Sequence, residues 1–136
     1  MNLSMGLQSI GDSAFSDCRK LTALELPKGL VEIGARAFSS CEKLQTIVIP
    51  DGISNLGDNA FVHCTNLKKV IIGEGLDTID NFVFSFCQDL TVTLPDSVNS
   101  IKEHAFLYSK NITIIAKKGS IGQTFALANG LTFVAK

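Results

Sequence analysis

A 23-residue repeat runs through most of this chain and constrains its fold more than any other feature. A small apolar residue followed by Phe, two further residues and Cys recurs at that spacing from Ala14, Ala37, Ala60 and Val83. A fifth copy begins at Ala105, where Ser109 stands in place of Cys. Repeats of this length are typical of solenoids, in which each unit buries one face against its neighbours. The sequence therefore predicts an α/β repeat solenoid rather than the core of a globular enzyme.

Each repeat also predicts its own elements. The polar residue before the Ala-Phe pair, such as Asp12, Asp58 or Asn81, is a good start for a single helical turn that drops the Phe into the core. After the Cys, apolar residues alternate, as at Ile47 and Ile49, which predicts a strand with one buried face. We therefore expect a parallel β-sheet on one face of the solenoid and short helical turns that carry Ala-Phe on the other.

Domain boundaries follow from the repeats. The five units start at residues 7, 30, 53, 76 and 98 and together cover residues 7–116. Residues 117–136 are expected to form a C-terminal cap, with Ser120 as the N-cap of a short helix and a last strand over Leu131 to Val134. Residues 1–6 look like the remnant of a preceding repeat and not like a cap. We therefore expect the C-terminal part of a longer array, with association through the uncapped N-terminal end as one consequence.

The four cysteines occupy equivalent places in successive repeats, at Cys18, Cys41, Cys64 and Cys87. Their side chains should point inward in parallel, as buried thiols that behave like small apolar groups. A disulfide between neighbours and a zinc site are the alternatives, but the spacing suits neither of them well. The Ser at position 109 indicates that the thiol itself is dispensable.

Composition and motifs exclude several functions. Twelve basic and thirteen acidic residues give a net charge of −1, and no charged block suggests binding to nucleic acid. No apolar run approaches the ~20 residues that insertion into a bilayer requires. The adjacent His63 and Cys64 are a poor nucleophile pair, because neighbouring residues at a turn point in different directions. We therefore expect no catalytic residues, no metal and no cofactor.

The repeat resembles that of the BspA-like leucine-rich repeat family, whose unit has the form LxxIgxxAFxxCxxLxxIxIPxx. The second unit, LVEIGARAFSSCEKLQTIVIPDG, shows the match well, and five such units cover residues 7–116. The resemblance implies a right-handed leucine-rich-repeat array that binds proteins or mediates adhesion on bacterial or protozoan surface or secreted proteins.

Two surfaces depart from the pattern and are the candidate binding sites. Around the Ala-Phe pairs, polar residues of the early repeats give way to Phe82, Phe86, His104 and Tyr108 in the last two. Exposed aromatic clusters mark interfaces more often than chance, although these side chains could also cover the edge of the core. The second surface is the outward side of the strands, with Val48, Ile71, Lys68 and Lys69, where β-branched residues also simply suit strands.

The expected function is therefore a non-catalytic module for protein binding or adhesion. Its partner would be a protein ligand such as a host or cell-surface protein. The alternative is a structural spacer or stalk within a larger surface protein, with no specific ligand of its own.

Overall fold

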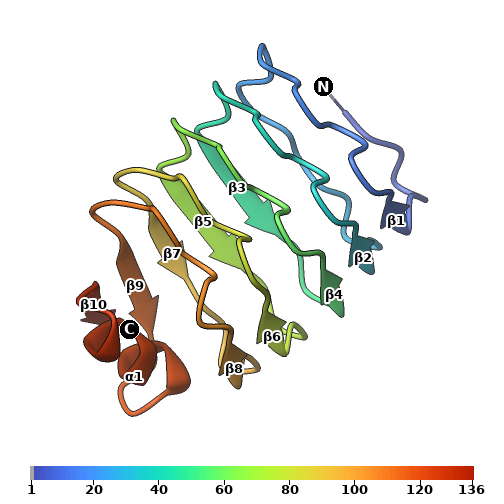
Figure 1. The fold of residues 1–136 in the computed structure, drawn as a ribbon. Coiled ribbons are helices and arrows are strands. Elements are labelled where there is room, and N and C mark those ends of the chain that lie inside the picture. Colours follow the sequence, from blue (N-terminus) through green and yellow to red (C-terminus); the bar gives the residue numbers. More distant parts are fainter. Residues whose placement is uncertain (1) are drawn as a thin grey trace.

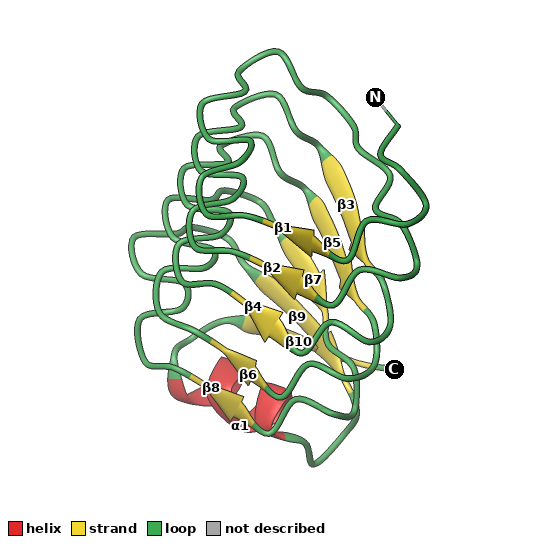
Figure 2. Ribbon diagram, turned by 90° about the vertical axis from the view of Figure 1, so that its right-hand side faces the viewer, coloured by secondary structure: helices red, strands yellow, loops and turns green. Residues whose placement is uncertain are grey.

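In a computed structural model, which describes residues 2–136, the chain winds as a solenoid whose strands all pair in parallel (Figure 1). Repeats 2 to 5 each contribute one shorter and one longer strand, whereas repeat 1 contributes only a shorter one and the C-terminal segment only a longer one. The longer ones are β3 (Thr46–Ile49), β5 (Lys69–Ile72), β7 (Thr91–Thr93), β9 (Thr113–Ala116) and β10 (Thr132–Ala135), which form one sheet in the order β3-β5-β7-β9-β10. The shorter ones are β1 (Ser9–Ile10), β2 (Glu32–Ile33), β4 (Asn55–Leu56), β6 (Thr78–Ile79) and β8 (Ser100–Ile101). The two rows of strands run side by side along the solenoid (Figure 2).

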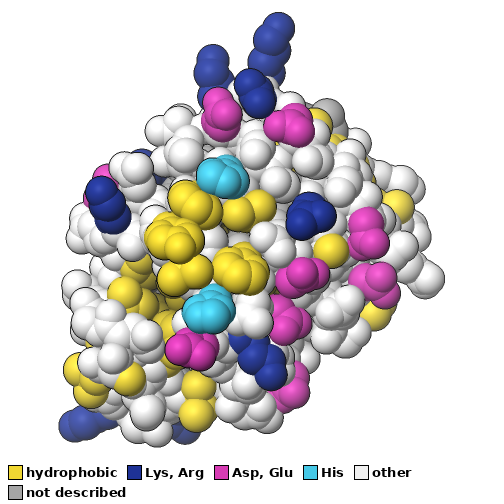
Figure 3. Space-filling model, in the orientation of Figure 1, with side chains coloured by type: hydrophobic (Ala, Val, Ile, Leu, Met, Phe, Trp, Pro, Cys, Tyr) yellow, Lys and Arg dark blue, Asp and Glu magenta, His cyan; other side chains and the backbone are white. Residues whose placement is uncertain are grey.

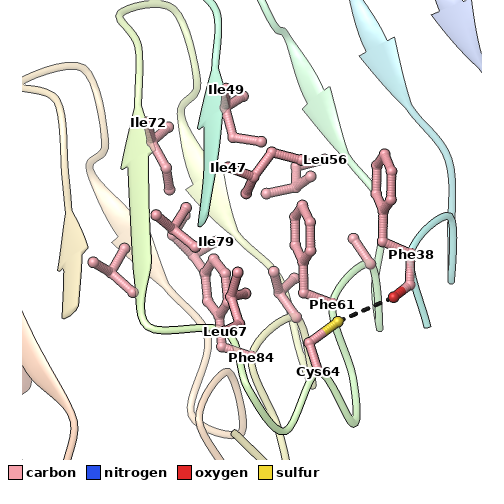
Figure 4. Packing of buried hydrophobic residues seen from close by; sticks show 14 of the residues in the cluster. Phe38, Ile47, Ile49, Leu56, Phe61, Cys64, Leu67, Ile72, Ile79 and Phe84 are labelled. Atoms are coloured by element: carbon pink, nitrogen blue, oxygen red, sulfur yellow. Dashed lines mark hydrogen bonds between the residues drawn. The ribbon is translucent and has the colours of Figure 1, made fainter. Parts of the chain in front are cut away.

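The core fills the space between these two rows. The Phe residues of the five repeats stack along it, with ring centroids 5.2 to 5.7 Å apart. Alternate strand residues such as Ile47 and Ile49 point toward the rings, as do Leu56 and Ile79 from the opposite row (Figure 4). Strand β7 keeps this register although its repeat is one residue short, because Val92 pairs with Val70 and Ile114 on either side.

The segments that carry Ala-Phe are not the helical turns expected from the sequence. They are runs of turns in which two residues in each of repeats 1 to 4, and one in repeat 5, have a φ near +60°, which no right-handed helix accepts. In these segments, successive backbone amides donate alternately to a carbonyl of their own repeat and to a carbonyl of the next repeat. In repeat 1, Ala14 N–H bonds within its own turn, to the Gly11 carbonyl at 3.2 Å, whereas Phe15 N–H crosses to the Ala37 carbonyl of the next repeat at 2.7 Å. Hydrogen bonds to the neighbouring repeat thus replace those of a helix.

Helix α1 (Ile121–Ala128) lies across the C-terminal end of the solenoid, and β10 adds a last strand beside β9 (Figure 1). Phe125 of this helix packs on Phe106 with ring centroids 5.9 Å apart, so it extends the Phe column by one ring. Ser120 occupies the N-cap position, but its side chain makes no capping hydrogen bond. The other end is open: Phe15, Cys18 and Leu21 are only half-buried, whereas their equivalents in repeat 2 are fully buried.

At that open end, Asn2 pairs in parallel with Glu25, so it lies where the strand of a preceding repeat would stand. Met1 lies outside the described residues. All four cysteines are free thiols, and three of them are fully buried, in line with the predicted column. Among residues 2–136, no group of His, Cys, Asp and Glu side chains is arranged to hold a metal ion.

Candidate functional site

Two columns of exposed side chains run along the turns, on either side of each Ala-Phe pair. Each column takes one residue from every repeat, and neighbours in a column are 22 or 23 residues apart in the chain. The first turn column is Ser13, Arg36, Asn59, Phe82 and His104; the second turn column is Asp17, Ser40, His63, Phe86 and Tyr108.

The backbone of both columns is left-handed. Nine of the ten residues have φ values between 57° and 63°, and His104 is the exception. Asn, Asp and His tolerate this conformation better than bulky residues do. Polar residues fill it in the first two repeats, whereas Phe82, Phe86 and Tyr108 fill it in the last two. Because a large ring at such a position is unfavourable for folding, its presence points to a role other than stability.

The aromatic residues stack along the columns and form one surface, the aromatic strip, which consists of His63, Phe82, Phe86, His104 and Tyr108. The ring centroids of His63 and Phe86 are 4.2 Å apart, those of Phe86 and Tyr108 are 5.1 Å apart, and those of Phe82 and His104 are 5.8 Å apart. The structure therefore stacks the four aromatic and histidine residues singled out from the sequence in two pairs, Phe82 with His104 and Phe86 with Tyr108. Each pair joins neighbouring repeats, and His63 extends the second pair.

The aromatic strip is open to solvent. Tyr108 is 69% exposed and Phe86 is 39% exposed, while Phe82 is half-buried. Figure 3 shows the two histidines on opposite sides of a cluster of apolar side chains on this face. A backbone ladder holds the rings in place, because the amide of Phe86 donates to the Leu107 carbonyl at 3.3 Å and the amide of His63 donates to the Ser85 carbonyl at 3.0 Å. Such a rigid aromatic surface suits an apolar partner.

The second candidate is the outward face of the main sheet. Val48 pairs with Ile71 across β3 and β5, and Val48 is 58% exposed. Together with Ala23, Glu25 and Thr46 these residues line the sheet-face groove, an open hollow of about 960 Å³. Every outward position from β3 to β10 except Lys69 is a β-branched residue, and the groove is also lined by the charged residues Glu25, Lys28 and Asp51.

The two lysines predicted for this face lie apart. Lys69 stands in the row between Thr46 and Thr91. Lys68 reaches toward the next repeat, where its ammonium group donates to the Gln88 carbonyl at 3.1 Å and lies 3.6 Å from the Asp89 carboxylate. A hydrogen bond from Asn111 and then the charge of Lys68 lower the pKa of Asp89. Lys68 therefore ties two repeats together and does not join Val48 and Ile71.

The thiols of the core are poor nucleophiles. Burial raises the pKa of the Cys41 thiol to about 11 and that of Cys87 to about 12, and it raises the pKa of Cys64 as well. Cys64 lies next to His63 in the chain, but its thiol donates to the Phe38 carbonyl at 3.1 Å inside the core (Figure 4). The protonated thiol is not the reactive form of cysteine.

Among residues 2–136, no helix is long and apolar enough to cross a bilayer.

Comparison with solved structures supports the fold. The chain superposes on the pneumococcal vaccine antigen PcpA with a TM-score of 0.83 and 23% identity. The superposition covers 99% of this chain and 35% of the antigen. It also matches a leucine-rich repeat protein from Bacteroides ovatus (TM-score 0.63, 20% identity, 98% of this chain and 44% of that one). A leucine-rich cell surface protein from Faecalibacterium prausnitzii gives a TM-score of 0.54 at 19% identity, over 99% of this chain and 59% of that one.

No curated protein matches the sequence. The model of the BspA-type leucine-rich repeat region, by contrast, matches residues 1–113 in six copies. That is one copy more than the five units counted above, and the match begins within the segment that pairs with Glu25. The chain belongs to the BspA-type leucine-rich repeat family.

Proposed function

We propose that this chain is a non-catalytic protein-binding module and that the aromatic strip is its contact surface. The observation that carries the proposal is the placement of Phe86 and Tyr108, two exposed rings on left-handed backbone where earlier repeats carry polar residues. Because the rings are already held by stacking, they lose little side-chain entropy when a partner covers them. Aromatic residues of this kind carry much of the binding energy in protein interfaces.

A surface or secreted setting and a role in adhesion are part of the same proposal. Their support is the family resemblance together with a structural relative from Faecalibacterium prausnitzii that is a cell surface protein. In such a setting the partner would be another cell-surface protein, for example one on a host cell. A spacer without a ligand is the competing function, favoured by the regular repeats.

The double variant Phe86→Asn/Tyr108→Asn tests the strip. Asn suits the left-handed backbone, so the variant should fold with nearly unchanged stability. Its binding to purified cell-surface ectodomains on an array should weaken by at least about 30-fold, since even one of the two aromatic anchors contributes ~2 kcal/mol. The matched control is Asp17→Asn/Ser40→Asn, which introduces the same residue at the same column positions in the first two repeats.

A third variant, Val48→Glu/Ile71→Glu, tests the sheet-face groove. Loss of binding in this variant alone would move the contact surface to the sheet and overturn the role of the strip. No binding by the wild type or any variant would favour the spacer, whereas equal binding by all of them would place the contact surface outside both the strip and the groove.

A further inference from the structure

In repeats 1 to 4, backbone amides on one side of the turns form a row that points toward the following repeat. In repeat 3, the amide of Phe61 donates to the Val83 carbonyl at 2.9 Å. In repeat 4, Phe84 N–H donates to the Ala105 carbonyl at 2.9 Å, two residues before the equivalent bond from Phe86 to the Leu107 carbonyl. In each of these repeats, the amides of alternate residues therefore donate hydrogen bonds to the carbonyls of alternate residues in the next repeat.

Repeat 5 presents the same row, and two of its amides have no hydrogen-bond acceptor in the described part of the chain, although Phe106 itself is buried against Phe125. The amides of Phe106 and Tyr108 stand in the places of Phe84 and Phe86, and neither has an acceptor among residues 2–136. The third amide of the row, that of His104, donates to the Asn81 side chain at 3.2 Å. Unpaired amides next to a protein surface retain a demand for acceptors. Two donors are thus held in place directly beside the exposed ring of Tyr108.

The C-terminal cap does not complete this row. Phe125 supplies a further ring to the core and β10 supplies a further strand to the sheet, but no residue of the cap accepts from Phe106 or Tyr108. The cap thus closes the core and the sheet edge and leaves the turn edge open.

We propose that an extended segment of the protein partner docks on this edge, in the place of a sixth turn. Two of its carbonyls, from alternate residues, accept from the amides of Phe106 and Tyr108, and an apolar side chain between them packs on the exposed rings of Tyr108 and Phe86. The proposal rests on the function proposed above and specifies how the partner is held. Recognition through the main chain resembles the addition of a strand to an open sheet edge, where backbone bonds give affinity and side chains give selectivity.

A second copy of this chain is the other occupant with suitable chemistry. Its first repeat offers the carbonyls of Ala14 and Ser16, which have no donor among residues 2–136. Successive repeats, however, stack at strand spacing, about 4.8 Å, whereas α1 lies across the end that would have to be met (Figure 1). A helix is about 10 Å wide, so it keeps a whole solenoid away but leaves room for a single segment at the turn edge.

A random linear dodecapeptide display library provides the probe. Peptides are enriched on the wild-type chain and depleted on Phe86→Asn/Tyr108→Asn, and the best peptide is titrated into the ¹⁵N-labelled protein. Hydrogen exchange at the Phe106 and Tyr108 amides should slow at least tenfold, while the amides of Phe61 and His63, which are already bonded, serve as internal controls. An ester in place of a peptide bond weakens its carbonyl as an acceptor. Peptides with an ester at either of the two accepting positions should therefore bind about fivefold more weakly.

Three outcomes would overturn the inference. A strip-dependent peptide that leaves the Phe106 and Tyr108 amides unchanged would remove the main-chain contact but leave the aromatic strip as the binding surface. The absence of any strip-dependent peptide, while ectodomain binding still depends on the strip, would show that the partner binds as a folded surface. Concentration-dependent protection of the two amides without peptide, together with a dimer in sedimentation, would assign the edge to a second copy.

Discussion

Each buried cysteine donates a hydrogen bond from its thiol to the backbone of the repeat before it. Cys41 and Cys64 reach the carbonyls of Phe15 and Phe38 at 3.2 and 3.1 Å. Ser109 makes the equivalent bond to Phe84 at 2.6 Å and also accepts from the Cys87 amide at 3.0 Å. A hydroxyl therefore meets the same need as a thiol in the fifth repeat. The equivalence explains why this position tolerates either residue.

Because the folded chain keeps its buried thiols protonated, the protein should become less stable as the pH rises into the alkaline range. Burial raises the pKa of Cys87 from 9.0 to about 12, so the folded chain holds this proton above pH 9 whereas the unfolded chain releases it. Its contribution to the free energy of unfolding is complete below about pH 9 and falls as the pH rises. Between pH 8 and pH 10.5, the free energy of unfolding measured by urea denaturation should fall in the wild type. The decrease should be smaller by about 2 kcal/mol in Cys87→Ala.

The comparison of the two proteins at each pH cancels the contributions of all groups that they share. An identical pH dependence of wild type and variant would mean that Cys87 ionises in the folded protein as readily as in the unfolded chain.

At the scale of elements, the row of short strands is interrupted between β4 and β6. On the N-terminal side of the break, Gly34 and Gly57 follow β2 and β4; a Cβ at Gly57 would lie 2.3 Å from the Ala35 amide nitrogen. Asp80 takes the equivalent place after β6, and β6 pairs only with β8. The close approach of neighbouring repeats thus leaves no room for a side chain after β2 and β4. The ladder opens at Asp80, whereas Lys102 at the equivalent place after β8 leaves the pairing of β6 with β8 intact.

Gly57→Ala should therefore destabilise the protein by about 1–3 kcal/mol, because the new methyl group overlaps backbone that cannot move aside easily. The matched control is Gly11→Ala at the same place in repeat 1, where a Cβ would meet nothing within 4 Å. This control should leave stability unchanged or raise it slightly. Thermal or urea denaturation of both variants measures the difference, and equal stabilities would contradict the steric explanation.

The turns that carry Ala-Phe show the limit of local sequence patterns at this scale. Asp12 and Asp58 are good helix starts, and the prediction of a helical turn after them was wrong. The amides of this segment bond to carbonyls of the next repeat, such as Ser13 to Ala35 at 2.9 Å, and left-handed residues turn the chain so that they can. An acceptor 22 residues away is not visible in local propensity.

At the scale of the whole molecule, the two ends of the solenoid differ. The C-terminal end is closed over its core by Phe125 and β10. At the N-terminal end, Phe15 stacks on Phe38 on one side and is half-buried, whereas Phe61 stacks between two rings and is fully buried. Because each repeat contacts only its neighbours, stability should decrease toward the open end.

Phe61→Ala should cost ~3–5 kcal/mol, as expected for a fully buried ring, and Phe15→Ala roughly half as much. Native-state hydrogen exchange should likewise show faster opening of the amides in repeat 1 than of those in repeat 3. Equal losses of stability in the two variants would mean that the solenoid unfolds as one unit and that its open end does not fray first.

The sequence by itself determined the repeat, the inward columns of Phe and Cys, and the strands. These features depend on the order of apolar residues, because a strand with one buried face must alternate and a stacked unit must recur. The candidate aromatic residues were also visible, as departures from the repeat.

How those aromatic residues meet depends on tertiary contacts. The left-handed turns, the stacking of His63 on Phe86 and of Phe86 on Tyr108, and the unpaired amides of Phe106 and Tyr108 all follow from the arrangement of residues 21 to 23 apart. The physical reason is that the backbone donors of one turn are satisfied by the carbonyls of the next. The conformation of a turn, and what its last copy leaves open, is therefore set by its neighbour in space and not by its neighbours in the chain.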